Sequence, residues 1–172
     1  MAAPSNDTFL NQVNANIGIA HKVSRLYFDD TDDCDDAMQE MMYQLWRAYP
    51  TFKGESRFST WMYSVCLKTA LTYRRKNKRN KNEPLSDDHH QIADAGPTRE
   101  EDAMALLFSA IGKLQPVNRA IVLLYLEKMS YDEIASITGL TKTNVSVRLV
   151  RIKKELETQL KNQLNSIEDV NL

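Results

Sequence analysis

The sequence predicts an all-α protein made of two small helical domains that are joined by a flexible linker. Apolar residues recur at helical spacing through most of the 172 residues. Only 5 glycines and 5 prolines are present, which leaves few positions for the turns of an all-β fold. The polar stretch at residues 80–98 includes Pro84 and Pro97 and has few large apolar side chains. We therefore expect helical domains at residues 1–79 and 99–172, with an acidic linker at residues 80–98.

Three helices are predicted in the N-terminal domain. The first spans residues 7–28, and its apolar face consists of Leu10, Val13, Ile17, Ala20, Val23 and Leu26. The second begins near Asp32 or Asp33, and its expected core residues are Met38, Met41, Met42, Leu45 and Trp46. The third begins near Ser59 and continues into a basic segment.

Four helices are predicted in the C-terminal domain, and the last two form a helix-turn-helix. Thr98 and Glu101 have the spacing of a capping box that opens the first helix, and Pro116 suits the first turn of the second. Ser130 and Glu133 form another capping box at the start of the third helix. Gly139 is placed where that helix must end, because glycine adopts a positive φ at little cost.

The last helix, which Thr141 is expected to cap, separates apolar from basic residues. Its inward stripe is predicted to be Val145, Leu149, Ile152 and Leu156. No carboxylate occurs from residue 142 to residue 154, whereas five residues there are basic: Lys142, Arg148, Arg151, Lys153 and Lys154. A helix of this kind suits the major groove of DNA and its phosphates. The alternative is a helical hairpin with a solvated basic face.

The net charge is only −1, but the charges are segregated along the chain. Seven carboxylates lie between residues 29 and 40, and seven basic residues lie between residues 68 and 81. Within the basic segment one helical face is formed by Lys68, Thr72, Arg75, Lys76 and Arg79. Such a face fits an anionic partner, although a solvated surface is the alternative.

The loop at residues 49–61, ahead of the basic helix, is rich in aromatic side chains. Aromatic rings beside cations can hold unstacked bases, and each stack is worth ~1 to 3 kcal/mol. We expect Phe52, Lys53 and Arg57 to make such contacts. Phe58 and Trp61 have an alternative role as inward anchors of the loop.

The sequence offers no metal or cofactor site. Cys34 and Cys66 lack the spacing of zinc ligands, and His89 and His90 lie in a polar stretch. No export signal and no apolar run of about 18 residues is visible, so we expect a cytoplasmic protein without membrane insertion. The sequence contains neither a phosphate-binding loop nor a catalytic triad, the motifs that would indicate an enzyme.

Taken together, these residues resemble the extracytoplasmic-function (ECF) group of bacterial RNA polymerase sigma factors. Residues 33–40, followed by Leu45 and Trp46, are similar to the family's acidic helix that docks on the polymerase clamp. Residues 52–61 are similar to its loop that captures a base of the minus 10 element. Residues 114–116 with Arg119, and residues 131–135 and 145–151, resemble its domain that reads the minus 35 element.

The resemblance implies a role for each group of residues. The clamp would be contacted by Asp35, Asp36, Gln39 and Glu40. The minus 10 element and its melting would involve Phe52, Lys53, Gly54, Ser56, Arg57, Phe58, Lys68, Arg75, Lys76 and Arg79. The minus 35 duplex would be contacted by Lys142, Thr143, Asn144, Ser146, Val147, Arg148 and Arg151. The linker carboxylates Glu83, Asp87, Asp88 and Asp94 would enter the polymerase as mimics of nucleic acid.

The implied function is that of a non-catalytic specificity subunit. It would bind the clamp and flap regions of core RNA polymerase, recognise promoter DNA as duplex at minus 35 and melted at minus 10, and start transcription. An anti-sigma factor is a further implied partner. Lys68 and Ser146 depart from the family pattern, which commonly has an asparagine and a basic residue at these places, so an altered promoter preference is expected.

Other functions compatible with the sequence are separable by experiment. One is a stand-alone helix-turn-helix regulator whose N-terminal half dimerises or senses a ligand, and which binds a DNA palindrome without polymerase. Another is a helical adaptor without a nucleic-acid partner, which would leave both basic helices unexplained.

Overall fold

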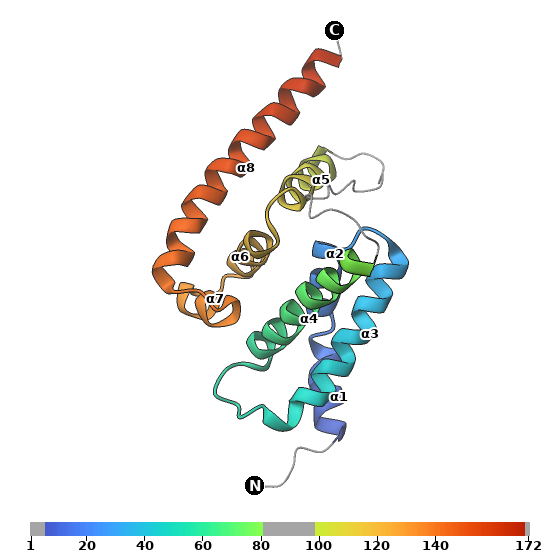
Figure 1. Cartoon of the computed structure of the whole chain (residues 1–172). Coiled ribbons are helices and arrows are strands. Elements are labelled where there is room, and N and C mark those ends of the chain that lie inside the picture. The colour runs from blue at the N-terminus through green and yellow to red at the C-terminus, as the bar shows by residue number, and fades with distance from the viewer. Residues whose placement is uncertain (1–5, 81–98, 171–172) are drawn as a thin grey trace. The chain divides into compact units, whose positions relative to one another are not determined.

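The computed structural model describes residues 6–80 and 99–170, and the chain divides into two compact units, residues 1–85 and 86–172. In both described ranges every regular element is a helix (Figure 1), as the predicted fold class requires. The predicted linker at residues 80–98 lies outside the described residues except for Asn80, where a helix ends.

The first unit contains four α-helices and a short 3-10 turn. They are α1 (Asn6–Ala15), α2 (Gly18–Tyr27), α3 (Thr31–Ala48), η1 (Tyr49–Thr51) and α4 (Phe58–Asn80). Helices α2 and α3 both pack against α4 (Figure 1). The core that they share includes Val23, Met41, Leu45, Met62 and Cys66, all of which are fully buried. This packing decides which face of α4 meets solvent.

The prediction of one helix over residues 7–28 is wrong, because the chain breaks between α1 and α2. The side chain of Asn16 donates to the carbonyl of Gln12 at 2.8 Å, so it competes with the helical backbone bonds. Gly18 lies two residues after Asn16, and glycine has a poor helix propensity. On α1, Phe9 and Val13 are buried, whereas Leu10, which was expected to face the core, is 53% exposed.

The buried stripe of α3 is narrower than the sequence predicts. Ala37, Met41 and Leu45 have no exposed surface, which gives a strict spacing of four residues. Met38 and Met42 are only half-buried, and Trp46 is 59% exposed. The expectation that Trp46 belongs to the core is therefore wrong, because α3 meets its neighbours along one row of side chains.

The second unit contains the four predicted helices. They are α5 (Arg99–Gly112), α6 (Pro116–Leu126), α7 (Tyr131–Thr138) and α8 (Lys142–Val170). Thr98, the predicted cap of the first of them, lies outside the described residues. The turn between α5 and α6 is held by Arg119, which is 1% exposed and donates from its Nε to the carbonyl of Leu114 at 2.8 Å.

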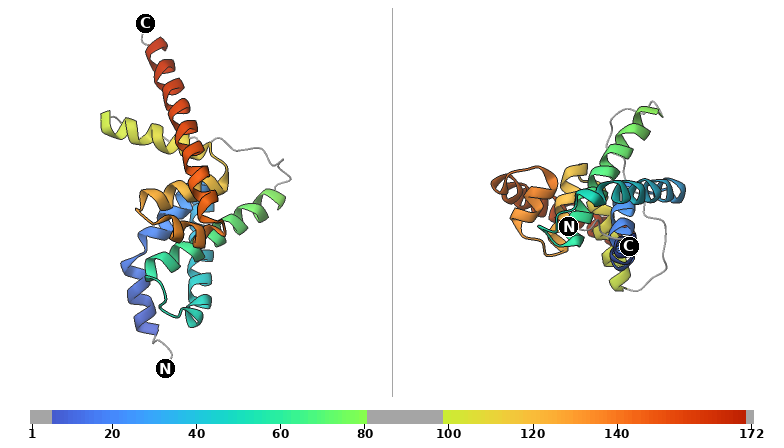
Figure 2. Two further views of the ribbon diagram at one scale, coloured as in Figure 1. Left: turned by 90° about the vertical axis from the view of Figure 1, so that its left-hand side faces the viewer. Right: turned by 90° about the horizontal axis from the view of Figure 1, so that it is seen from below.

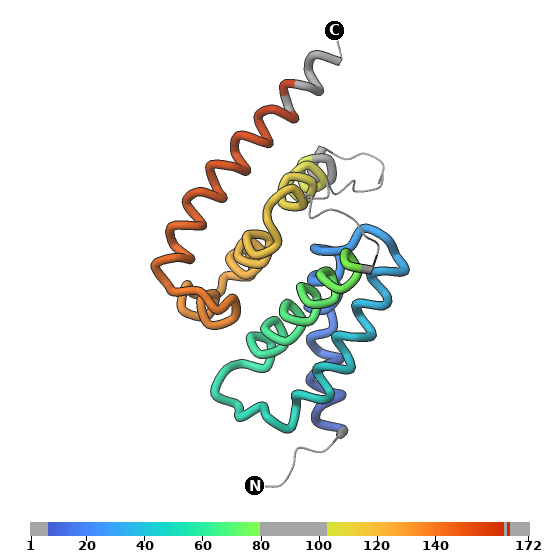
Figure 3. Tube along the Cα trace, viewed as in Figure 1, coloured from blue at the N-terminus to red at the C-terminus, as the bar shows by residue number. Residues whose placement is uncertain are grey.

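The helix-turn-helix has the geometry that its capping residues predict. The Ser130 amide donates to the Glu133 carboxylate at 2.9 Å, and the Glu133 amide donates to the Ser130 hydroxyl at 3.2 Å. Gly139 ends α7 with a φ of 72°, and the Thr141 hydroxyl accepts the Asn144 amide at 3.2 Å. The short turn from α7 into α8 is visible in Figure 3.

One apolar row fixes the rotation of α8 about its own axis. Val145, Leu149 and Ile152 are at most 2% exposed, and Leu156 is half-buried. The left view of Figure 2 shows α8 as one unbroken helix that extends well beyond α7. Among the described residues, the fully buried side chains of α8 thus all lie in its N-terminal half.

Neither cysteine of the described chain is paired. Cys66 is buried within the first unit, and its burial raises the pKa of the thiol to about 12. Burial also raises the pKa of Cys34, whose thiol donates to the carbonyl of Phe28 at 3.3 Å. Among the described residues, no group of three or more His, Cys, Asp or Glu side chains could hold a metal ion. Within the same residues, no helix combines the length and apolarity needed to cross a membrane.

Substituting Gly139 should destabilise the second unit. An alanine there must adopt the left-handed conformation, which costs ~1 to 2 kcal/mol for an L-residue. Gly139→Ala should therefore lower the urea midpoint measured by circular dichroism. The matched control is Gly18→Ala, where an added Cβ has no atom within 4 Å and no positive φ is required. An equal loss of stability in both variants would contradict the assigned role of Gly139.

Candidate functional site

The residues expected to read duplex DNA lie together at the start of α8. Lys142, Thr143, Asn144, Val147 and Arg151 are exposed, whereas Ser146 and Arg148 are half-buried. Thr143, Val147 and Arg151 lie on the side of the helix opposite Val145 and Leu149, and the other four residues lie on its flanks. The structure thus places all seven predicted contacts outside the core of this unit, but it does not give them equal freedom.

Two of the basic residues of α8 are held by neighbouring helices. The Lys142 ammonium lies 2.8 Å from the Asp132 carboxylate on α7, in an exposed ion pair. The Lys153 ammonium donates to the Tyr125 hydroxyl on α6 at 3.0 Å and lies 4.4 Å from the centre of that ring. The hydrogen bond with Tyr125 raises the pKa of Lys153. These contacts brace one flank of α8 against α6 and α7.

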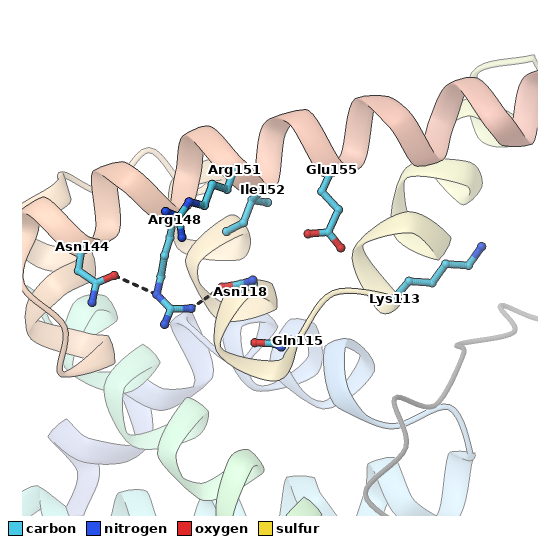
Figure 4. A pocket seen from close by; sticks show the side chains of 8 residues that line it. All are labelled: Lys113, Gln115, Asn118, Asn144, Arg148, Arg151, Ile152 and Glu155. Atoms are coloured by element: carbon cyan, nitrogen blue, oxygen red, sulfur yellow. Dashed lines mark hydrogen bonds between the residues drawn. The ribbon is translucent and has the colours of Figure 1, made fainter.

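The other flank of α8 borders a polar cleft of about 410 Å³. Its lining residues come from the turn between α5 and α6, from α6 and from α8: Lys113, Gln115, Asn118, Asn144, Arg148, Arg151, Ile152 and Glu155. The guanidinium of Arg148 donates from Nε to Asn144 Oδ1 and from Nη1 to Asn118 Oδ1, each at 3.0 Å (Figure 4). The side chain of Arg151 has no hydrogen bond or ion pair within the described chain.

Sequence reasoning did not identify Asn118. This residue lies 30 positions before Arg148, and periodicity within one helix gives no signal for such a contact. Only the packing of α6 against α8 brings the two side chains together. The amide oxygen is an acceptor that suits a guanidinium donor.

Four aromatic rings form a cluster in the first unit: Tyr49, Phe52, Phe58 and Trp61. Their centroids lie between 5.1 Å, for Phe52 and Trp61, and 6.4 Å, for Tyr49 and Phe52. Tyr49 is buried and its hydroxyl donates to Gln12 on α1 at 3.1 Å, which ties the cluster to the fold. Phe58 and Trp61 are half-buried, so their alternative role as anchors agrees with this packing. Phe52, which was expected mainly to contact bases, is an anchor as well.

The aromatic cluster closes a short exposed loop. Phe52 precedes the loop and Phe58 follows it as the first residue of α4, while all five residues at 53–57 are exposed. Gly54 has a φ of 71°, a conformation that favours glycine. Lys53, Gly54, Ser56 and Arg57 are therefore displayed together beside the half-buried rings.

The predicted basic face of α4 is solvent-exposed. Lys68, Thr72, Arg75, Lys76 and Arg79 are all exposed. They lie opposite Met62, Cys66 and Ala70, which have no exposed surface. Because α4 begins at Phe58, one helix connects the aromatic cluster to this basic face.

The acidic residues of α3 form a second surface of the first unit. Asp35, Asp36 and Gln39 are exposed, and Glu40 is half-buried. The Tyr73 hydroxyl on α4 donates to Asp36 Oδ2 at 3.4 Å, so one predicted docking residue also contacts a neighbouring helix. Burial of the Tyr73 phenol raises its pKa, and the nearby Asp36 carboxylate adds to that increase.

An exposed aromatic pair on α3 was missed as a candidate contact. The rings of Tyr43 and Trp46 lie 6.5 Å apart, and both side chains are more than half exposed. Tyr43 is three residues after Glu40, so the pair extends the acidic surface toward the C-terminal end of α3. The apolar spacing of Trp46 had indicated the core instead, because periodicity does not say where a buried stripe ends.

Comparison with known proteins assigns a family to both units. Residues 13–80 match the family model described as sigma-70 region 2. Residues 104–156 match the model described as sigma-70, region 4. Together the two matches take in well over half of the chain, one in each structural unit.

Curated relatives and solved structures agree with that assignment. The ECF RNA polymerase sigma-E factor of Haemophilus influenzae is 28% identical over 142 residues, 75% of each chain. The factor of the same name from Escherichia coli is 27% identical over 157 residues, 81% of each chain.

Two solved complexes contain chains with this fold. One is the sigma factor RpoE with the anti-sigma factor NepR from Bartonella quintana, with a TM-score of 0.71, 17% identity and coverage of 89% of this chain and 96% of that chain. The other is CnrH with the cytosolic domain of CnrY, with a TM-score of 0.66, 21% identity and coverage of 92% and 91%. With both regions matched in order along the sequence, the chain belongs to the sigma-70 family of RNA polymerase sigma factors, in its extracytoplasmic-function group.

Proposed function

We propose that this chain is the promoter-specificity subunit of an RNA polymerase holoenzyme. It binds core polymerase, recognises a promoter at two places, melts the DNA and starts transcription. The observation that carries this proposal is the match of region 2 and region 4 to separate units, each with its own exposed basic surface. The subunit supplies binding and strand opening, and the polymerase supplies the chemistry.

The second unit contacts the minus 35 element as duplex DNA. The start of α8 enters the major groove, as in other helix-turn-helix proteins. Thr143, Val147 and Arg151 are exposed at this end of the helix and are available to base edges or phosphates. To contact a DNA phosphate, Lys142 must break its ion pair with Asp132. An exposed pair of this kind is worth at most ~1 kcal/mol, so the exchange costs little.

The first unit opens the minus 10 element. Extruding a base costs a few kcal/mol, and stacking with pocket contacts offsets that cost. The half-buried rings of Phe52 and Phe58 are fixed in the aromatic cluster, so they offer a rigid edge rather than mobile side chains. Lys53 and Arg57 flank that edge, and the basic face of α4 follows the phosphates of the adjoining DNA.

The acidic surface of α3 binds the clamp of core polymerase. Asp35 and Gln39 are fully available there, while Glu40 is bound by the Gln44 amide at 2.8 Å. The exposed rings of Tyr43 and Trp46 supply apolar area beside the carboxylates, and such residues are enriched at protein interfaces. We place Tyr43 and Trp46 in the same docking surface. The linker carboxylates complete the contact with the polymerase, near its active centre.

An anti-sigma protein is the second proposed partner. The two solved structures compared above were both determined as complexes, and one of these partners is described as an anti-sigma factor. Such a partner would hold the chain away from polymerase until a signal releases it. The promoter assay described below contains no anti-sigma protein, so it tests the promoter function whatever the identity of that partner.

Mobility-shift and transcription assays with and without core polymerase test the proposed function. The chain with core should retard promoter fragments selected from a random library and should produce a defined transcript. The chain alone should bind the same fragments weakly, because its net charge of −1 gives little general attraction to DNA. Tight binding of a palindrome by the chain alone, with no transcript after core is added, would instead establish the stand-alone regulator.

Arg148→Ala should weaken recognition of the minus 35 element by ~1 to 3 kcal/mol if the guanidinium reaches a base edge. The measurement is holoenzyme affinity for the selected promoter and for versions with each upstream base pair replaced. If Arg148 contacts a base, replacing the contacted base pair should weaken binding of the wild-type holoenzyme but not of the Arg148→Ala holoenzyme. A uniform loss on every sequence would assign Arg148 to a phosphate instead.

Reversing two charges on α3 should abolish polymerase binding. Asp36→Lys with Glu40→Lys places cations against a surface that is complementary to carboxylates, and like-charge contacts cost several kcal/mol. Affinity for core is measured by fluorescence anisotropy, and circular dichroism checks the fold because Asp36 also accepts from Tyr73. Asp7→Lys, on α1, controls for an effect of net charge; it changes that charge by +2, the same as either single variant at Asp36 or Glu40. Unchanged affinity in the folded double variant would remove the acidic surface from the docking site.

A further inference from the structure

Arg148 is fixed between two helices before any DNA is bound. Its Nε donates to Asn144 on the same helix, and its Nη1 donates to Asn118 on α6, both at 3.0 Å (Figure 4). Of the five N–H donors of a guanidinium, these bonds use two. The other three donors therefore keep a fixed orientation in the plane of the guanidinium, at the edge of the cleft that Arg151 also lines.

The contribution of Asn118 differs from that of Asn144. Asn144 lies one turn before Arg148 on α8, is exposed, and is itself expected to contact DNA. Asn118 lies in the first turn of α6 and is half-buried, so it ties the guanidinium to the body of the unit. The position of α6 is in turn fixed by buried Arg119 and by Ala120, Ile121 and Leu124. A half-buried acceptor on such a helix holds its donor better than a mobile surface side chain does.

We propose that Asn118 is a positioning residue for DNA recognition: it holds the Arg148 guanidinium in the orientation that meets the minus 35 duplex. The inference rests on the proposed function of α8. Arginine loses much rotamer entropy when it is ordered, and a side chain that is ordered in advance loses less on binding. Asn118 thus increases affinity through Arg148, without a DNA contact of its own.

A double-mutant cycle in the holoenzyme tests this coupling. Asn118→Ala should weaken binding of the selected promoter on the order of five-fold, the effect of one net hydrogen bond. In an Arg148→Ala background the same substitution should have almost no further effect, because its only route of action has been removed. Asn14→Ala, an exposed asparagine on α1, is the matched control and should leave the affinity unchanged.

Nuclear magnetic resonance of the free full-length chain provides a readout that a general loss of stability does not affect. The bond from Nη1 to Asn118 should slow rotation of the Arg148 guanidinium, so separate Nη signals are expected in the wild type. Asn118→Ala should merge them, while Asn118→Asp, which keeps an Oδ acceptor, should keep them separate. The Arg148→Lys variant has no guanidinium at this position, so the signals that are missing from its spectrum are those of Arg148.

The possible results separate this inference from the proposed function. If Arg148→Ala leaves promoter affinity unchanged, the assignment of Arg148 to DNA recognition fails and Asn118 has nothing to position. If Arg148→Ala weakens binding but Asn118→Ala does not, recognition by Arg148 stands and the role of Asn118 is refuted. Additive losses in the cycle would also refute it, because independent effects would mean that Asn118 acts through stability or through its own DNA contact. A large coupling energy between Asn118 and Arg148 in the cycle, together with merged Nη signals in Asn118→Ala, would establish the positioning role of Asn118.

Discussion

The burial of one apolar face on each of two helices determines the two basic surfaces of this sigma factor. On α4, Met62, Cys66 and Ala70 have no exposed area, and on α8, Val145 has none. Burying such side chains is favourable by ~25 cal/mol per Å² of apolar surface, so rotation of either helix would be costly. The opposite faces must then meet water, and these are the faces that carry the basic residues. The placement of the proposed DNA contacts is in this sense a consequence of core packing.

The basic residues so displayed are not equivalent. Lys142 and Lys153 are held by Asp132 and Tyr125, and Arg148 is held by two asparagines, whereas the Arg151 side chain has no such partner among the described residues. Intramolecular contacts therefore divide one basic helix into braced cations and at least one available cation. A side chain that keeps its intramolecular contacts on binding, as proposed for Arg148, loses less entropy, and an available one such as Arg151 can adapt to the shape of the DNA. A helix with both kinds combines a fixed register with tolerance of local DNA structure.

In the first unit, aromatic packing has a comparable effect on the exposed loop. The aromatic cluster joins η1 to the start of α4, and the buried ring of Tyr49 connects it to Phe9 on α1 at 4.8 Å. The loop at residues 53–57 is therefore short, closed and supported from beneath. Rigid support of this kind suits the proposed capture of an extruded base, because the site would not have to be ordered at the moment of binding.

The sequence by itself determined the helical class, the helix-turn-helix and the face of each basic helix, because capping boxes, a left-handed glycine and helical periodicity are local signals. Ser130, Gly139 and Val145 are examples whose roles follow from neighbours within one or two turns. The break after α1 has local causes in Asn16 and Gly18, which the apolar periodicity of residues 7–28 does not reveal. Tertiary structure alone decided the exposure of Trp46, the aromatic cluster and the bond from Arg148 to Asn118. Each of these depends on a side chain that another part of the fold places opposite, and periodicity along one helix contains no information about that neighbour.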